Sequence, residues 1–267
     1  MVDSATILFA LLACALYIAA SAVLMRRFFH REGPRDGINR LLAIGAIAGH
    51  AAALFLAING GDNQNMTMAN VLSLVAWLMT ISMLISSLYF QNVILLPVVF
   101  GLSAVAILLS VFVPDAYAIN IALKPGLVIH ITLSLFAYGT LIIALLYALQ
   151  VNYIGGKLKQ KDSTILHSSL PPLMMLDRIL IKLLYVGTGL LFIAIVSGGV
   201  FLDDMLDKQH IHKTVLSVIA LAVYATALIG NAIWGWRGRT LMMLVSVSSV
   251  VLTLAYFGSR FVREVLL

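Results

Sequence analysis

The stretch from Val71 to Ser110, VLSLVAWLMTISMLISSLYFQNVILLPVVFGLSAVAILLS, decides the fold class because its 40 residues include no charged side chain. As one α-helix it would be about 60 Å long at ~1.5 Å per residue, which is twice the ~30 Å hydrocarbon thickness of a bilayer. The stretch therefore predicts two membrane spans. The polar pair Gln91-Asn92, followed by Pro97, marks the expected turn between them.

The rest of the chain predicts an all-α, polytopic membrane helical bundle that forms a single integral membrane domain over residues 1–267. The sequence is 62% hydrophobic and only 10% charged, whereas soluble domains carry roughly 25% charged residues. Because so few charges cannot cover a surface that faces water, we expect the lipid bilayer to surround the protein. Eight apolar runs approach the roughly 20 residues that a span requires: 5–25, 41–59, 69–90, 93–112, 125–150, 179–202, 214–235 and 240–258.

The distribution of lysine and arginine predicts that both termini lie outside the cytoplasm. Five arginines between residues 26 and 40 follow the first apolar run and no lysine or arginine precedes it, which is typical of a retained span rather than a cleaved leader. When eight spans are traced from there, 12 of the 17 basic residues fall on the inner side and five on the outer side. The formal net charge of +6 is therefore a topology signal, and nucleic acid is not an expected partner.

The longest connection on the inner side is expected between residues 153 and 178. We predict a polar loop at its start, from Gly155 to Asp162, and a short interfacial helix at its end, from Pro171 to Arg178. No extramembrane domain is predicted, and the sequence contains no Gly-rich phosphate loop, nucleophile elbow or H-E-x-x-H motif. These features predict a protein that is not an enzyme.

Two histidines lie inside predicted spans, where an ionisable side chain is costly unless it is paired or ligated. His50 follows Gly45 and Gly49, whose spacing of four permits close approach of another surface to the helix. Two interpretations stay open at this point. His50 is either an axial ligand beside a flat group such as haem, or a hydrogen-bonded residue where two helices pack tightly.

His130 lies about one and a half turns into the run that begins at Pro125. Ser134 and Tyr138 share its helical face, so they are candidates to orient the ring of a ligating histidine. The alternative is a polar stripe that faces other helices. From the predicted topology, His50 and His130 are expected to face one pocket in the outer half of the bilayer.

The remaining candidates carry weaker signals. Cys14 is the only cysteine, which excludes a disulfide framework and a cysteine metal cluster. His210 and His212 lie near three aspartates in a predicted outer loop, and we interpret them as a weak metal site or as a solvated loop that caps the next helix. The spans contain no buried Asp, Glu or Arg, which disfavours an ion-coupled carrier.

Four stretches occur in a characteristic order: Val128–Tyr138, Lys213–Ser217, Gly235–Arg239 and Ala255–Gly258. In that order they resemble the histidine-bearing helix, the lysine-led helix start, the cytoplasmic turn and the last span of the CcsA-type cytochrome c assembly family. The resemblance covers most of the chain and is greatest to the short YpjD-type bacterial inner-membrane subgroup.

The resemblance implies a cofactor, haem of b type, and a set of residues that would bind it. His50 and His130 would be the axial ligands, each through a neutral imidazole nitrogen. Lys124, Lys213 or Arg260 at the outer rim would pair with the haem propionates. The implied partners, besides lipid, are other membrane proteins of the cytochrome and haem pathways.

The sequence departs from the family pattern at two places. The tryptophan-rich segment before the lysine-led helix is replaced here by residues 203–212, and Ile229 and Asn231 stand near the place of a second intramembrane histidine. The resemblance thus implies a non-enzymatic haem-handling protein and not a chain that attaches haem to cytochrome c by itself. One alternative is an assembly chaperone or accessory subunit of another membrane complex without haem, which would dock through residues 155–178. A small-solute permease is disfavoured by the lack of buried charge.

Overall fold

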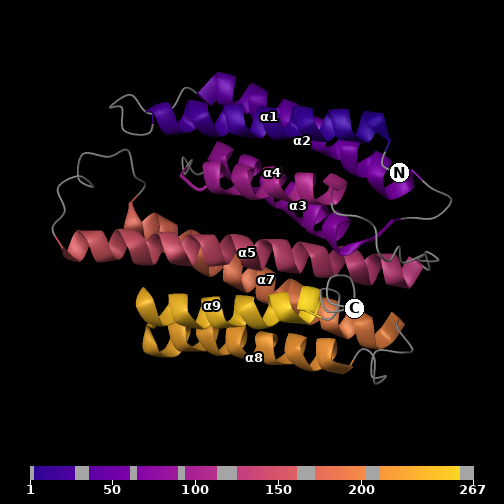
Figure 1. The fold of residues 1–267 in the computed structure, drawn as a ribbon. Helices are drawn as coiled ribbons and strands as arrows, with labels where there is room; N and C mark the ends of the chain where they lie inside the picture. Colours follow the sequence, from indigo (N-terminus) through magenta and orange to yellow (C-terminus); the bar gives the residue numbers. More distant parts are fainter. Residues whose placement is uncertain are drawn as a thin grey trace. The chain divides into compact units, whose positions relative to one another are not determined.

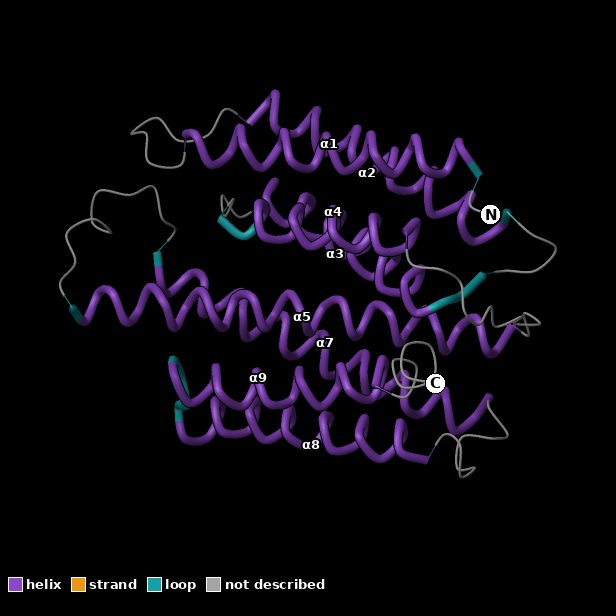
Figure 2. Tube along the Cα trace, in the orientation of Figure 1, coloured by secondary structure: helices purple, strands orange, loops and turns teal. Residues whose placement is uncertain are grey.

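The computed structural model describes residues 3–27, 36–60, 65–89, 94–112, 125–160, 172–201 and 211–258, and nearly all of them lie in helices (Figures 1 and 2). This confirms the all-α prediction. Within these ranges, seven helices are long and apolar enough to cross a membrane. They are α1 (Ser4–Arg27), α2 (Asp36–Asn59), α3 (Met68–Tyr89), α5 (Pro125–Lys159), α7 (Leu173–Phe201), α8 (Ile211–Trp234) and α9 (Arg239–Thr253), the last continued by the π-helix η1 (Leu254–Gly258).

The eighth apolar helix, α4 (Leu96–Phe112), is shorter than these seven spans when α9 and η1 are counted together. Its 17 residues extend about 26 Å at ~1.5 Å per residue, slightly less than the ~30 Å hydrocarbon core. The predicted break inside Val71–Ser110 is confirmed, because α3 ends at Tyr89 and α4 begins at Leu96. Pro97 lies in the first turn of α4, where its missing N–H leaves no helical hydrogen bond unmade.

The chain divides into two compact units, and the first of them (Met1–Ile121 with Ser163–Pro171) contains α1 to α4. Helix α1 contacts both α2 and α4, and α3 packs against α4. Small and branched side chains fill its centre: Ala10, Ala13, Ala53, Ile107 and Val111. Because alanine keeps helix axes close together, van der Waals contact and hydrogen bonds between helices can stabilise this packing inside lipid.

The second unit (Ala122–Asp162 with Pro172–Leu267) contains α5, α7, α8, α9 and η1. Helices α5 and α7 make its most extensive contact, while α9 packs against both α5 and α8. Two hydrogen bonds between hydroxyl groups link these helices. One joins Tyr224 on α8 to Ser249 on α9 at 2.8 Å, and the other joins Tyr138 on α5 to Thr253 on α9 at 3.0 Å.

The connection between α5 and α7 differs from the prediction at its start. Helix α5 does not end near Gln150 but continues through Gly155 and Gly156 to Lys159. Two basic side chains in its last turn, Lys157 and Lys159, interact favourably with the carbonyl end of the helix dipole. The predicted polar loop at Gly155 is therefore wrong, since helix-terminal charge and packing outweigh the low helix propensity of two glycines.

The predicted separate interfacial helix over Pro171–Arg178 is also wrong. Helix α7 begins at Leu173 and runs without a break to Phe201. The buried residues Leu176, Leu180 and Leu184 recur every four positions, so one apolar stripe passes straight through the charged positions around Arg178. Arg178 itself is exposed on the other side of the helix.

Helix α8 begins three residues earlier than the predicted span. Its first turn contains His212, which is exposed, and Lys213, which is half-buried. His212 is therefore part of a helix rather than a loop, in agreement with the interpretation of this segment as the start of the next helix. His210 lies outside the described residues, as do Lys124 and Arg260.

We predict that two glycines on α7, about half a helical turn apart, differ in how a larger side chain at their position affects stability. A Cβ at Gly187 would lie 2.7 Å from Cδ2 of the fully buried Leu141 on α5, whereas a Cβ at Gly189 would meet no atom within 4 Å. Gly187→Val should lower the free energy of unfolding by about 1–3 kcal/mol relative to Gly189→Val, because only the first substitution overpacks the contact. Circular dichroism during unfolding in mixed micelles measures both variants. Equal stabilities would contradict the α5–α7 packing described here.

Candidate functional site

His50 lies at the centre of the first unit and is fully buried. Its Nδ1 is 3.1 Å from the hydroxyl of Tyr17 on α1, and its Nε2 is 2.9 Å from Oγ of Ser73 on α3. The Tyr17 ring meets the imidazole edge-on, with 5.8 Å between the ring centroids. It also packs on the ring of Phe100 on α4, with 5.6 Å between the centroids. One imidazole thus connects, directly or through Tyr17, all four helices of the unit.

These contacts occupy both ring nitrogens of His50. A neutral imidazole carries one N–H and one lone pair, and a hydroxyl can either donate or accept a hydrogen bond. In either tautomer, one hydroxyl donates to the lone pair while the other accepts from the N–H. The arrangement as it stands leaves His50 no nitrogen for a metal ion, since iron would have to displace Tyr17 or Ser73.

The two glycines before His50 face α1 rather than an open space. A Cβ at Gly49 would lie 3.4 Å from Cβ of Ala13 and 3.6 Å from the carbonyl oxygen of Phe9. A Cβ at Gly45 would lie 3.4 Å from Cδ1 of Leu16. Of the two interpretations of this stretch, the structure supports tight helix packing with a hydrogen-bonded histidine.

His130 lies in the second unit and is half-buried on α5. Its Nδ1 is 3.0 Å from the carbonyl oxygen of Ala194 and 3.1 Å from Oγ of Ser197, both on α7. Among the described residues, His130 forms no hydrogen bond with the side chains of Ser134 or Tyr138, the partners expected from the sequence. The carbonyl of Ser134 accepts a hydrogen bond from Tyr256 at 2.9 Å, and the hydroxyl of Tyr138 pairs with Thr253.

The carbonyl of Ala194 determines the tautomer of His130. A carbonyl oxygen only accepts hydrogen bonds, so Nδ1 must carry the proton and donate it. The lone pair is then on Nε2, which has no hydrogen-bond partner among the residues that the structure describes. Metal-ligating histidines usually donate their other ring N–H to a carbonyl or carboxylate in this way. The donor set of His130 therefore fits an axial ligand of haem iron.

An aromatic cluster joins α5 to η1 in the second unit. The ring of Tyr138 stacks on that of Tyr256, with 5.0 Å between the ring centroids, and meets the ring of Phe257 edge-on, with 5.5 Å between the centroids. Tyr256 and Phe257 belong to η1, a π-helical turn of a kind that is frequent at functional sites. The hydroxyl of Tyr256 donates a hydrogen bond to the carbonyl of Ser134, one helical turn after His130, which joins η1 to the part of α5 that carries this histidine.

The other predicted site residues differ in where they lie. Lys213 is in the second unit, in the first turn of α8, whereas Lys124 and Arg260 fall outside the described residues. His50 and His130 belong to different units, so the expectation that they share one pocket stays a prediction. Within the described ranges, no group of three or more His, Cys, Asp or Glu side chains is placed to hold a metal ion.

Sequence reasoning missed the groups that position both histidines. Tyr17, Ser73 and Ser197 come from helices other than the one that carries the histidine they contact, and Ala194 contributes a backbone oxygen. The one available signal was the polarity of the side chains. A serine or tyrosine inside an apolar run is expected to hydrogen bond across helices, although the run does not indicate the partner.

We predict that the bonds to His50 stabilise the first unit. Tyr17→Phe and Ser73→Ala should each lower the free energy of unfolding by about 0.6–1.7 kcal/mol, the range for hydrogen bonds between membrane helices. Ser82→Ala is the matched control on α3, because the exposed Ser82 donates only to Leu78 of its own helix at 2.8 Å. Thermal unfolding in mild detergent measures all three. Loss of stability in the control alone would show that the described bonds do not hold the helices together.

Comparison with known proteins places these features in a family. A model of the cytochrome c assembly protein family matches residues 39–267. The inner membrane protein YpjD of Escherichia coli strain K12 is 35% identical over 260 residues, which cover 97% of this chain and 98% of YpjD. An uncharacterized 28.8 kDa protein of Azospirillum brasilense is 34% identical over 147 residues, or 54% of each chain. No solved structure matches the chain.

These matches confirm the resemblance that the ordered sequence stretches indicated. The near full-length match to YpjD, together with seven helices able to span a bilayer, makes the chain a multi-pass inner-membrane protein. The match to the family model covers well over half of the sequence and includes both spans discussed above, with His50 and His130. The chain belongs to the cytochrome c assembly protein family.

Proposed function

We propose that this protein handles haem in the inner membrane during cytochrome c assembly and that His130 is an axial ligand of the haem iron. The single observation that carries the proposal is the state of the His130 ring. Its N–H is donated to the carbonyl of Ala194 at 3.0 Å, and its Nε2 lone pair has no partner among the described residues. Membership of a cytochrome c assembly family supports haem as the group, because cytochromes c are haem proteins.

The protein's own contribution is to hold and orient the ligand. Ala194 and Ser197 on α7 fix the His130 ring on α5, the two helices with the most extensive contact in their unit. Bound haem would supply the redox and ligand-exchange chemistry of iron. The rings of Tyr138, Tyr256 and Phe257 pack on one another and hold η1 against α5, the helix that carries His130.

His50 has a different role in this proposal. Both of its nitrogens are hydrogen bonded and the glycines beside it pack on α1, so we assign it to the structure of the first unit. The expectation that His50 is a second axial ligand is therefore not part of this proposal, whereas propionate pairing by Lys213 and both termini outside stay predictions. We further propose that the protein has no catalytic activity of its own and acts with other membrane proteins of the haem pathway.

We predict that haem binding depends on His130 and not on exposed histidine. The purified protein in mild detergent should develop a Soret band on titration with haem, and His130→Ala should weaken the affinity by tenfold or more. The exposed His212 provides the matched control, and His212→Ala should titrate like the wild type. Ser197→Ala should have a smaller effect than His130→Ala, because the carbonyl of Ala194 still accepts the Nδ1 proton.

Two results would argue against this assignment. A wild-type protein without a Soret band after haem addition favours the alternative of an assembly chaperone that works without pigment. A band that persists unchanged in His130→Ala but is lost in His50→Ala would move the ligand to the first unit, provided that the variant retains the wild-type helical content.

A further inference from the structure

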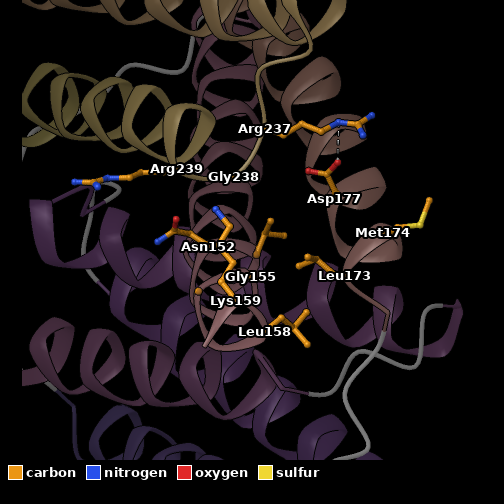
Figure 3. A pocket seen from close by; sticks show the side chains of 12 residues that line it. Asn152, Gly155, Leu158, Lys159, Leu173, Met174, Asp177, Arg237, Gly238 and Arg239 are labelled. Carbon is orange, nitrogen blue, oxygen red and sulfur yellow. Dashed lines mark ion pairs between the residues drawn. The ribbon is translucent and has the colours of Figure 1, made fainter. Parts of the chain in front are cut away.

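A pocket of about 760 Å³ lies at one end of the second unit (Figure 3). Neither His50 nor His130 lines it. It is formed by the last turns of α5, the first turns of α7 and the turn between α8 and α9. All of its lining residues belong to this one unit. Its apolar part includes Val151 and Leu158 on α5 and Leu173 and Met174 on α7.

The polar part of the pocket carries an excess of positive charge. Lys159, Arg237 and Arg239 contribute three cations, and Asp177 contributes one anion. Arg237 and Asp177 form an ion pair at 3.4 Å, and Figure 3 shows Arg237 and Arg239 extending to opposite sides of Gly238. The ion pair neutralises Arg237, and no ion pair of Lys159 or Arg239 is found among the described residues, so their charges remain to attract an anion.

Backbone donors add to this positive character. The first N–H groups of an α-helix have no partner within the helix and attract anions. Helix α9 starts at the pocket with Gly238 as its N-cap, which has φ 59° and makes no side-chain capping bond. The first residues of α7, Leu173 and Met174, also line the pocket. Two helix N-termini and two cations, which form no ion pair with another described residue, therefore line one pocket.

The carboxylate of Asp177 indicates that the ligand also carries a hydrogen-bond donor. Its Oδ2 pairs with Arg237, but its Oδ1 is buried and has no hydrogen-bond partner among the described residues. A buried acceptor without a partner is destabilising, so a ligand with a donor group would satisfy it. The complementary ligand thus combines an anion, a hydrogen-bond donor and an apolar tail.

We propose that this pocket binds the headgroup of an anionic phospholipid that carries hydroxyl groups, the phosphatidylglycerol class. The phosphate is held by Lys159, Arg239 and the N-terminus of α9, a glycerol hydroxyl donates to Oδ1 of Asp177, and the acyl chains follow the apolar residues of α5 and α7. Basic pockets between membrane helices are a known type of lipid site. The lipid site is independent of haem binding, since its residues are separate from His130 and its partners.

Native mass spectrometry of the full-length protein tests this proposal with three lipids. Phosphatidylglycerol should bind saturably and more tightly than phosphatidylcholine, which has no net charge. It should also bind more tightly than phosphatidylmethanol, which has the same charge but no headgroup hydroxyl. Glycerol 3-phosphate and inorganic phosphate distinguish a lipid site from a site for a free phosphate, and neither should displace the lipid at equal concentration.

Variants assign the binding to this pocket. Lys159→Gln and Arg239→Gln should each weaken phosphatidylglycerol binding about fivefold, the order expected for one basic side chain near a membrane surface. Arg178→Gln is the matched control, because Arg178 is an exposed cation at the start of α7 that does not line the pocket. Asp177→Ala should abolish the preference for phosphatidylglycerol over phosphatidylmethanol.

Several results would overturn the proposal. These are equal binding of all three lipids, equal effects of Lys159→Gln and Arg178→Gln, or binding of a soluble phosphate at the same residues without binding of lipid. Far-UV circular dichroism of each variant confirms that it is folded. The Arg239→Gln variant leaves the ion pair between Arg237 and Asp177 intact, so weaker lipid binding in this variant reports loss of the ligand contact alone.

Discussion

A polar side chain inside lipid needs a partner, and the structure depends on how this constraint is met at two histidines. Water is absent from the hydrocarbon core, so an imidazole there must be paired within the protein or ligated. His50 has hydroxyl partners at both nitrogens, and these partners tie α1, α2 and α3 together. His130 has hydrogen-bond partners at Nδ1, and the lone pair on its Nε2 has no partner among the described residues. The same residue type therefore serves packing in the first unit and is suited to binding in the second.

The distinction between the two rings follows from the nature of their partners. Hydroxyl groups can donate or accept, so Tyr17 and Ser73 satisfy His50 in either tautomer. A carbonyl can only accept, so Ala194 forces the proton of His130 onto Nδ1. One backbone oxygen on α7 thereby sets which nitrogen is available for iron. The extensive α5–α7 contact, with Gly187 against Leu141, holds that oxygen in place.

The sequence predicted the helical class, the spans and the break between Tyr89 and Leu96, because hydropathy and length are properties of a single segment. It also predicted His50 and His130 as the polar positions of interest. It did not predict Ser73, Ala194 or Ser197 as their partners, since contacts between helices are set by packing. The sequence does not predict the continuation of α5 past Gly155 and Gly156 for a related reason: low helix propensity is a property of the segment itself, whereas the contact of Gly155 with Leu173 at the start of α7 is not.

The most direct measurement is the ¹⁵N NMR spectrum of the protein labelled at histidine, recorded before and after haem addition, with each ring assigned through its alanine variant. The account predicts that His130 carries its proton on Nδ1 in the free protein, and that haem changes the Nε2 signal of His130 while both signals of His50 stay in place. A proton on Nε2 of His130, or a response to haem confined to His50, would contradict it.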